Sequence, residues 1–213
     1  MKILITAGPT REAIDPVRFI SNRSSGKMGY AIARAAVARK HKVVLVSGPV
    51  NISLPKGTRV VSVVTAEDML KAVKENIRWC DVLVMAAAVA DWRPAAVSAQ
   101  KLKKRDKLLT IRLEPTTDIL LAVRSKKGRR MFIGFAAETG HLLEEARRKL
   151  KTKSLNLIVA NDVSRRDAGF DADTNKVTFM AADGEITDLP LMSKLAVAGR
   201  LIAWIERKGG RSR

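Results

Sequence analysis

Residues 3–30 read ILITAGPTREAIDPVRFISNRSSGKMGY, and this stretch decides the fold. Ile3 to Ala7 is an apolar run of strand length, and a helix rich in small residues is expected to begin at Gly26. About 18 residues join the two, whereas strand-to-helix connections in α/β units usually hold about 2 to 6. Ligands of α/β proteins bind at the carboxyl ends of parallel strands. We therefore expect this long loop to be structureless and functional.

Strand-like and helical runs alternate along the rest of the chain. Strands are expected at 43–47, 60–63, 82–86, 108–113, 131–135 and 157–160, and helices at 26–39, 66–77, 118–123 and 142–151. This alternation predicts an α/β fold, with a Rossmann-like, mainly parallel sheet of about five or six strands and flanking helices. Asp183-Gly184 predicts a small β-hairpin near the C-terminus, joining 177–181 to 185–187, and an amphipathic helix follows over 191–206. We expect one domain over 1–208 and a disordered tail over 209–213.

The composition is strongly basic. A formal net charge of +19 raises a non-catalytic nucleic-acid-binding protein as one alternative. Lysine and arginine are, however, spread over all the longer predicted helices, and no helix-turn-helix, zinc pattern or aromatic-interleaved platform for single strands is present. The single cysteine, Cys80, excludes an intrachain disulfide and is expected to be a buried thiol. Without a bilayer-length apolar run or a signal-peptide pattern, a cytoplasmic location is expected.

The segment Ser24-Ser25-Gly26-Lys27-Met28-Gly29 is not a Walker A loop. Ser21 and Met28 stand where that loop needs a glycine and a Ser or Thr, so the match fails and the sequence does not favour an ordinary P-loop ATPase. Gly26 and Gly29 supply half of a dinucleotide fingerprint. An NAD(P)- or flavin-binding oxidoreductase therefore stays open as a second alternative.

Three further segments stand where a site is expected, and each also has a purely structural explanation. Residues 84–94 run from a strand into small residues, which would let a ligand lie against the backbone or would only pack tightly under a helix. Residues 101–105 are basic, which suits a phosphate-rich substrate or a solvated turn. Residues 134–139 precede Lys149 and Lys153, two lysines on one helix face that would bind phosphate or only face solvent.

Together these segments resemble the phosphopantothenoylcysteine synthetase family of coenzyme A biosynthesis. The resemblance is carried, in order along nearly the whole chain, by residues 8–12 (GPTRE), 15–22 (DPVRFISN), 24–29 (SSGKMG), 87–91 (AAVAD), 101–104 (KLKK), 134–139 (GFAAET) and 160–162 (AND). In many bacteria this domain is the carboxyl-terminal half of a bifunctional protein whose other half is a flavin-dependent decarboxylase. The chain thus resembles a stand-alone synthetase or an excised domain, and a separate decarboxylase is a possible partner.

The resemblance implies a ligase that joins cysteine to 4′-phosphopantothenate. In the bacterial form, CTP activates the carboxylate as an acyl-cytidylate and pyrophosphate leaves, after which the cysteine amine displaces CMP. A carboxylate that meets a triphosphate calls for Mg²⁺ and lysines rather than a histidine base. The resemblance also implies a homodimer, for which residues 162–187 are the expected contact, and it assigns no metal ligands.

The same resemblance implies roles for individual residues. Asn22 would hold the acyl group and Lys101 the triphosphate, and these two are the expected catalytic residues. Nucleotide contacts are implied for Met85, Ala86, Ala87, Asp91, Thr117, Asp118, Ile119, Leu120, Phe135, Lys149 and Lys153, with Gly26, Lys27 and Met28 near phosphates. Thr117 departs from the bacterial pattern, which has proline there, so ATP stays open as a less favoured nucleotide beside CTP.

Overall fold

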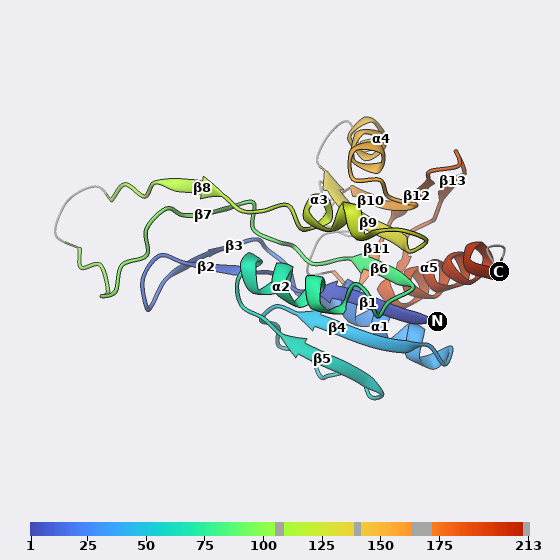
Figure 1. The fold of residues 1–213 in the computed structure, drawn as a ribbon, viewed down its shortest axis with the longest axis horizontal. Coiled ribbons are helices and arrows are strands. Elements are labelled where there is room, and N and C mark those ends of the chain that lie inside the picture. The colour runs from blue at the N-terminus through green and yellow to red at the C-terminus, as the bar shows by residue number, and fades with distance from the viewer. Residues whose placement is uncertain (105–108, 139–141, 163–171, 211–213) are drawn as a thin grey trace.

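The computed structural model describes residues 1–104, 109–138, 142–162 and 172–210. Its centre is an eight-stranded sheet in the order β13-β12-β10-β9-β6-β1-β4-β5 (Figure 1). The strands are β1 (Lys2–Ala7), β4 (Lys42–Ser47), β5 (Thr58–Ser62), β6 (Val82–Met85), β9 (Met131–Glu138), β10 (Leu157–Asp162), β12 (Val177–Ala181) and β13 (Ile186–Asp188). The first six are parallel and follow the order 3-2-1-4-5-6 of Rossmann dinucleotide folds. The predicted fold class is confirmed.

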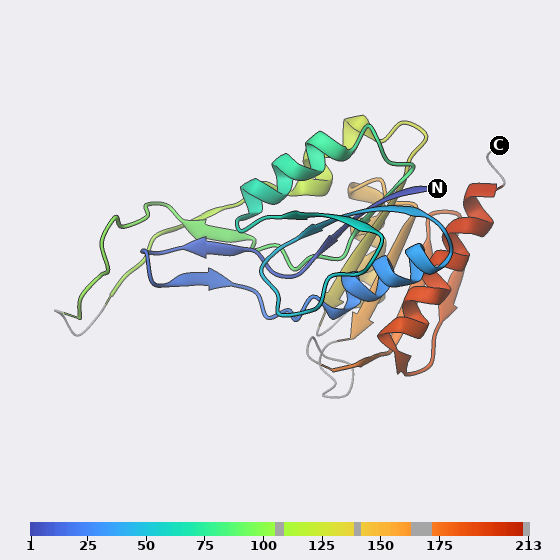
Figure 2. The ribbon, with the colours of Figure 1, turned by 90° about the horizontal axis from the view of Figure 1, so that it is seen from below.

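Helices cover both faces of this sheet, which is why its central strands are continuously apolar. Helices α1 (Lys27–Ala38) and α5 (Lys194–Gly209) lie side by side on one face, as Figure 2 shows in blue and red. Helices α2 (Ala66–Asn76), α3 (Ile119–Val123) and α4 (Leu142–Thr152) cover the other face. Successive side chains of a strand point to opposite faces, so Ile3 and Ile5 pack toward α1 and α5, and Leu4 packs toward α2.

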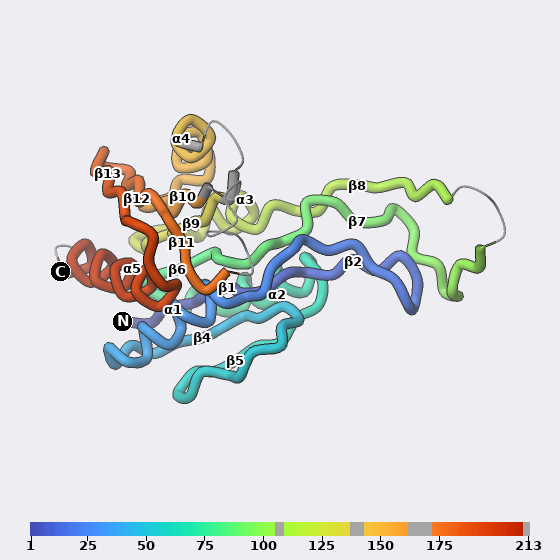
Figure 3. The backbone as a smooth tube through the Cα atoms, turned by 180° about the vertical axis from the view of Figure 1, so that it is seen from behind, coloured from blue at the N-terminus to red at the C-terminus, as the bar shows by residue number. Residues whose placement is uncertain are grey.

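Two small antiparallel sheets form an arm that extends away from the central sheet (Figures 1 and 3). One pairs β2 (Arg11–Ala13) with β3 (Phe19–Ser21), and the other pairs β7 (Trp92–Pro94) with β8 (Leu113–Pro115). We call residues 11–21 and the described part of 92–115 the arm. The connection between β1 and α1, expected to be structureless, therefore contains a hairpin.

The strand predicted over 108–113 was wrong. Residue 108 lies outside the described residues, residues 109–112 form no strand, and Leu113 begins β8 in the arm. A parallel strand needs a crossover of a dozen or more residues, usually a helix, on each side. Between 86 and 131 the described chain offers only α3 and the 3₁₀ turn η1 (Arg124–Lys126), which serve a single crossover. Leu109 and Leu113 are instead 58% and 44% exposed, so this segment is an exposed ribbon and not a strand of the central sheet.

Asp15 joins the two halves of the arm. One carboxylate oxygen accepts hydrogen bonds from the backbone amides of Val17 and Arg18, at 2.9 and 2.8 Å. The other accepts from the Arg18 guanidinium and from the Leu102 amide at 3.1 Å, and Arg18 also donates to the Leu102 carbonyl. The Arg18 guanidinium, with these amides, holds the pKa of the buried Asp15 carboxyl well below its usual range.

The C-terminal part also follows the prediction with adjusted boundaries. The hairpin β12–β13 turns at Gly184, whose φ of 91° favours glycine, and it extends the central sheet because β12 pairs antiparallel with β10. Strands β11 (Thr174–Asn175) and β14 (Met192–Ser193) form a further short pair. Helix α5 begins after its Ser193 cap and includes Gly209, which had been assigned to the tail; residues 211–213 lie outside the described residues. No helix in the described ranges is long and apolar enough to span a membrane.

Candidate active site

A pocket of about 500 Å³ lies at the carboxyl ends of the central strands. Its walls come from the loop before α1, from the chain that leaves β6, from the start of α3 and from β9. After β1 the chain passes to the face covered by α1, and after β6 to the face covered by α3. The pocket therefore lies at the topological switch point, where open α/β sheets bind their ligands.

Backbone amides of the chain that leaves β6 donate hydrogen bonds to β1 and to the loop that follows it. The Ala88 amide donates to the Gly8 carbonyl at 2.9 Å, and the Thr10 hydroxyl accepts from the Ala90 amide at 2.9 Å. The Thr6 hydroxyl accepts from the Ala87 amide at 3.2 Å. Two backbones this close leave room only for small side chains. The alanines after β6 therefore fit both explanations given for residues 84–94: they pack tightly, and they also line the pocket.

Two glycines place α1 beside the pocket. Gly26 caps the helix with a φ of 76°, a left-handed conformation that favours glycine. At Gly29 an added Cβ would lie 2.5 Å from the Cβ of Ala7, so the helix packs against β1 only because this position has no side chain. The helix has neither a side-chain cap nor an acidic residue in its first turn. Its N-terminus, at the pocket, favours negative charge.

Asn22 lines the pocket just before this helix. Its side-chain amide donates to the Val89 carbonyl at 2.8 Å, which orients the side chain across the gap between the loops that follow β1 and β6. An amide oriented in this way presents its oxygen and its second N–H to a ligand.

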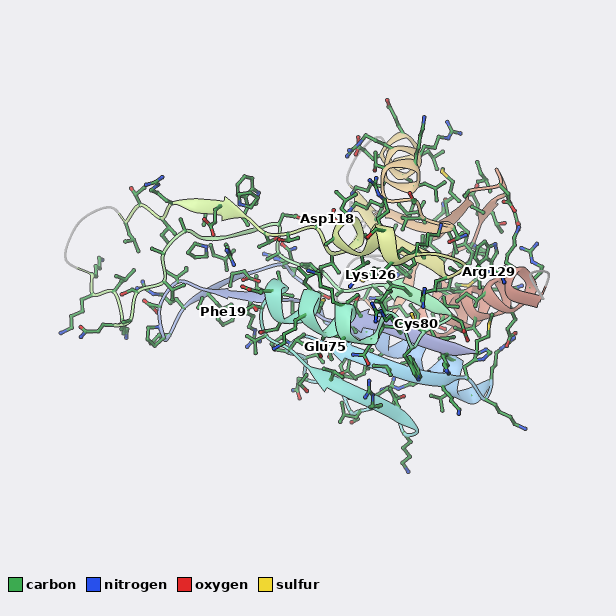
Figure 4. The ribbon with its side chains drawn as sticks, viewed as in Figure 1. Phe19, Glu75, Cys80, Asp118, Lys126 and Arg129 are labelled. Atoms are coloured by element: carbon green, nitrogen blue, oxygen red, sulfur yellow. The ribbon has the colours of Figure 1, made fainter. Side chains whose placement is uncertain are left out.

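The opposite wall is formed by α3 and α4. One carboxylate oxygen of Asp118 accepts from the Leu121 amide at 3.0 Å and so caps α3, where Figure 4 shows the side chain. The other oxygen is 2.7 Å from the Lys153 ammonium. Lys149 lies in the last turn of α4 and also lines the pocket, and Lys153 follows directly after the end of this helix. The capping carboxylate therefore holds a lysine at the pocket wall.

The structure brings all but one of the predicted site residues together. The pocket is lined by Asn22, Gly26, Lys27, Met28, Met85, Ala86, Ala87, Asp91, Thr117, Asp118, Ile119, Leu120, Phe135, Lys149 and Lys153. Lys101 is the exception: it is exposed, lies in the arm, and is not among the lining residues. The roles implied for these residues stay predictions, because lining the same pocket shows that the residues lie close together and does not show what each one does.

Several other lining residues have no role predicted from the sequence. These include Arg23, Asn161, Asn175 and Lys194. Asn161 belongs to residues 160–162, which carried part of the family resemblance, so its place in the pocket could have been predicted from the sequence. Asn175 and Lys194 lie more than 140 residues after the glycine segment in the sequence, and only the packing of α5 beside α1 brings them to the pocket. No local pattern could have identified them.

The charges of the walls suit a polyphosphate ligand. The cations Arg23, Lys27, Lys149, Lys153 and Lys194 line the pocket together with two carboxylates, those of Asp91 and Asp118. Among the described residues, no group of three His, Cys, Asp or Glu side chains could hold a metal ion. Mg²⁺ commonly uses one or two carboxylates together with substrate phosphates, so Asp91 and Asp118 fit a metal that arrives with a nucleotide.

Arg93, next to Asp91, has a structural role instead. Its guanidinium is 2.8 Å from the Glu114 carboxylate and 3.3 Å from that of Glu67, so it links β7 to β8 and to the start of α2. His41 lies at the other end of the molecule, between Glu206 and the N-terminal amine. His141 lies outside the described residues.

Comparisons with known proteins agree with this arrangement. The coenzyme A biosynthesis bifunctional protein CoaBC of Bacillus subtilis is 49% identical over 201 residues, which are 94% of this chain and 50% of that protein. The protein of the same name from Escherichia coli K12 is 46% identical over 198 residues, 91% of this chain and 48% of its own. The chain thus spans about half the length of the curated relatives it matches.

Solved structures give the same picture. The crystal structure of the C-terminal domain of a CoaBC protein superimposes with a TM-score of 0.85 at 45% identity, covering 99% of this chain and 96% of that domain. A Cab2 mutant in complex with phosphopantothenate-cysteine shares the fold, with a TM-score of 0.81 at 18% identity over 99% of this chain and 88% of that one. The sequence profile of the DNA/pantothenate metabolism flavoprotein C-terminal domain matches residues 1–208. The chain therefore belongs to the family of the DNA/pantothenate metabolism flavoprotein C-terminal domain.

Proposed function

We propose that the protein is a phosphopantothenate–cysteine ligase of coenzyme A biosynthesis. The observation that carries this proposal is the pocket at the switch point, which gathers Asn22 and four lysines. It is supported by relatives named for coenzyme A biosynthesis that are 46–49% identical over more than nine-tenths of this chain.

The proposed reaction has two steps. The carboxylate of 4′-phosphopantothenate attacks the α-phosphorus of the nucleotide, a new C–O–P bond forms, and pyrophosphate leaves with the electron pair of the broken P–O bond. The cysteine amine then attacks the acyl carbon, the nucleoside monophosphate leaves, and the amine loses a proton. Both steps concentrate negative charge, which cationic side chains and helix N-termini stabilise.

The position of each pocket residue suggests its role in these two steps. Asn22, oriented by the Val89 carbonyl, would hydrogen-bond the acyl oxygen. Lys149 and Lys153 would bind the nucleotide phosphates, with Lys153 held in place by Asp118. Asp91 and Asp118 would hold a Mg²⁺ ion that arrives with the nucleotide, and the ion would supply charge neutralisation. The small residues after β6 let the nucleotide approach the backbone.

The nucleotide we propose is CTP, with ATP less favoured. Thr117, which replaces the proline of the bacterial pattern, lines the pocket beside Thr116, whose amide and hydroxyl bond the Asp91 and Ala90 carbonyls. Those bonds fix the turn before α3 without a proline. A separate decarboxylase partner, which the same resemblance implies, and a cytoplasmic location, which the sequence pattern predicts, are both proposed here.

Pyrophosphate release tests this function directly. The purified protein would be given 4′-phosphopantothenate and Mg²⁺ with CTP or ATP, before and after addition of cysteine. We expect release with CTP that is sustained only when cysteine is present. Absence of release with both nucleotides would reject the ligase, and release with ATP alone would reject the choice of CTP.

The dinucleotide alternative loses its structural basis. In dinucleotide-binding Rossmann folds a short glycine-rich turn joins the first strand to its helix and holds the pyrophosphate. Here the β2–β3 hairpin occupies that connection, and only the second half of the fingerprint remains. We therefore propose no oxidoreductase activity.

We also propose a homodimer formed through the arm rather than through the region 162–187. The described part of that region extends the chain's own sheet as β12 and β13. The arm instead exposes apolar side chains, among them Val17, Phe19, Trp92, Val97 and Leu113, at 44–60% of their surface (Figure 4 labels Phe19). Exposed apolar patches mark interaction sites. A second copy is the proposed occupant because Lys101, the predicted triphosphate ligand, lies in the same arm away from its own pocket.

A further inference from the structure

Thr10 is a fully buried polar residue that the proposed reaction does not yet use. It lies in the loop after β1, it is 0% exposed, and it is not among the residues that line the pocket. A hydroxyl removed from water loses its hydrogen bonds to solvent, so a buried hydroxyl needs a partner within the protein. The partners of Thr10 therefore show what this residue does for the structure around it.

The amide and the hydroxyl of Thr10 both bond to the chain that leaves β6. The Thr10 amide donates to the Ala88 carbonyl at 3.3 Å, and the Thr10 hydroxyl oxygen accepts from the Ala90 amide at 2.9 Å. The Ala90 amide and the Val89 carbonyl belong to one planar peptide group. A hydrogen bond that fixes this amide therefore also fixes the direction of the Val89 carbonyl.

The carbonyl of Thr10 bonds to the residue before Asn22. It accepts from the Ser21 hydroxyl at 2.7 Å, and Ser21 is the last residue of β3. The side-chain amide of Asn22 in turn donates to the Val89 carbonyl at 2.8 Å. Thr10 therefore holds the chain next to the donor of this hydrogen bond and also the peptide group that contains its acceptor.

Asn22 needs such support because it is exposed. Packing does not lock the rotamer of an exposed side chain, whereas a hydrogen bond to a fixed acceptor does. The peptide between Val89 and Ala90 is bonded through its N–H to Thr10 and through its carbonyl to Asn22. Hydrogen bonds in such a chain polarise one another, so the bond to Thr10 also makes the Val89 carbonyl a better acceptor.

We propose that Thr10 is a positioning residue for the ligase reaction. It holds the Val89–Ala90 peptide and Ser21 in the arrangement that turns the Asn22 amide toward the reacting acyl group. This inference rests on the proposed function, in which Asn22 hydrogen-bonds the acyl oxygen. Because Thr10 does not line the pocket, it acts through Asn22 and not on a substrate.

Thr10→Val tests the hydroxyl, because valine keeps the branched shape of the side chain and cannot accept from the Ala90 amide. A small displacement of a group that acts in the transition state slows the chemical step strongly. We therefore expect kcat to fall about tenfold or more, while the KM values of the nucleotide and of the acid change by less than about twofold. Thr10→Ser keeps the hydroxyl and should restore most of kcat. Wild-type kcat in Thr10→Val would overturn the proposal.

Thr58→Val is the matched control for loss of a buried threonine hydroxyl. Thr58 lies in β5 at the edge of the sheet, and its buried hydroxyl oxygen has no hydrogen-bond partner among the described residues. The substitution removes the same atoms without breaking a hydrogen bond, so kcat should stay at the wild-type value. Equal losses of kcat in Thr58→Val and Thr10→Val would overturn the proposal.

Ser21→Ala keeps the proposal falsifiable if Thr10→Val does not fold. Ser21 is only half-buried, so this variant is expected to fold, and it removes the donor to the Thr10 carbonyl. We expect kcat to fall by about threefold or more with little change in either KM. Wild-type kcat in Ser21→Ala would then overturn the proposal.

A double substitution shows whether Thr10 acts through Asn22. Asn22→Ala removes the oriented amide without adding a charge. Thr10→Val in that background should lower kcat by no more than about twofold further, because members of one hydrogen-bond network do not contribute additively. A further loss as large as that caused by Thr10→Val alone would show that Thr10 supports the pocket independently of Asn22, and would overturn the proposal.

The side-chain amide resonance of Asn22 separates this inference from the ligase itself. Proton–nitrogen NMR observes this amide without any substrate, and its loss in Asn22→Ala assigns it. We expect Thr10→Val to shift or broaden the resonance, and Thr10→Ser and Thr58→Val to leave it in place. If these changes are seen while the wild type releases no pyrophosphate, the ligase fails and the support of Asn22 by Thr10 stands. If the wild type releases pyrophosphate while Thr10→Val changes neither the resonance nor kcat, the ligase stands and this proposal fails.

Discussion

Asn22 is the residue whose geometry most directly predicts a chemical effect. Asn22→Asp would replace the N–H donor that meets the Val89 carbonyl with a carboxylate and would place a second negative charge beside the reacting acyl group. We expect the overall rate to fall by about 10²-fold or more, while the dissociation constant of the nucleotide changes little. The measurement is steady-state turnover together with nucleotide titration.

Asn51→Asp is the matched control for this experiment, because Asn51 is exposed and does not line the pocket. It should keep wild-type turnover. Wild-type turnover in Asn22→Asp would remove Asn22 from the reaction.

Cys80 gives a second prediction for a single residue. Burial raises the pKa of its thiol to about 11, and the thiol donates to the Ile77 carbonyl. Because the thiolate is the reactive form, the native protein should react with a thiol reagent at pH 8 only as fast as it opens. Full reaction in denaturant is the positive control. Fast stoichiometric labelling of the native protein would contradict the burial of Cys80, which Figure 4 labels and which is 3% exposed.

At the scale of elements, the contact between α1 and β1 depends on one missing side chain. In Gly29→Ala the new Cβ would meet the Ala7 side chain at 2.5 Å, so the helix must shift away from the strand. We expect unfolding in denaturant to require about 1–3 kcal/mol less free energy. The pocket residues at the start of α1 would shift as well, so nucleotide affinity should fall in the same variant.

Gly199→Ala provides the control within another helix. Gly199 lies in α5, and an added Cβ would meet nothing within 4 Å. Alanine is the better helix former, so this variant should be more stable by about 0.5–1 kcal/mol. Equal destabilisation by both substitutions would show that close packing at Gly29 is not the cause.

The arm should be sensitive to acid through Asp15. Its pKa is lowered in the folded protein, so its contribution to stability is complete above the unfolded-state value of about 3.9 and is lost as the pH falls through the lower folded value. The difference in unfolding free energy between wild type and Asp15→Asn should therefore be constant from pH 7 to about pH 5 and shrink below about pH 4. A difference that does not change at low pH would contradict the role of the charge.

Periodicity identified most of these elements, and tertiary context accounts for the rest. The buried strands β1, β4 and β6 and the helices α2 and α4 were predictable because their apolar patterns are long and regular. The arm was not, because each of its strands is only three residues long and lies on a half-exposed ribbon. The pocket shows the same difference. Asn22 could be predicted from a local motif, whereas Lys194 reaches the pocket only through the packing of α5 beside α1.

At the scale of the whole molecule, the position of Lys101 allows a test of the proposed dimer. Lys101→Gln should suppress pyrophosphate release by about 10²-fold. If each arm serves the partner's pocket, an equal mixture of Lys101→Gln and Asn22→Asp chains, allowed to exchange, has one intact pocket in four. Activity should then return to about a quarter of the wild-type value.

The mixture also distinguishes the alternatives. If Lys101 acts within its own chain, every pocket in the mixture lacks one residue and no activity returns. A single species of monomer mass in sedimentation at micromolar concentration would reject the dimer. Trp92 is exposed on the arm, so Trp92→Lys should weaken association of the two chains and leave the central sheet unchanged.

The net charge of +19 acts on the molecule as a whole. Any polyanion is attracted to such a surface, and the attraction is screened by salt. We expect nucleic acid to bind without sequence preference and to dissociate by about 0.2 M salt. Persistent, sequence-selective binding above that concentration would revive the nucleic-acid-binding alternative.

The chain that leaves β6 lines the pocket and then continues directly into the arm. Asp91 is a pocket residue, and Trp92, the first residue of β7, is 53% exposed. The other two tryptophans, Trp79 and Trp204, lie in or against the hydrophobic core. A ligand that contacts Asp91 should therefore change the surroundings of one indole more than those of the others. The chain thus contains its own optical reporter, and tryptophan emission can follow the filling of the pocket without any label.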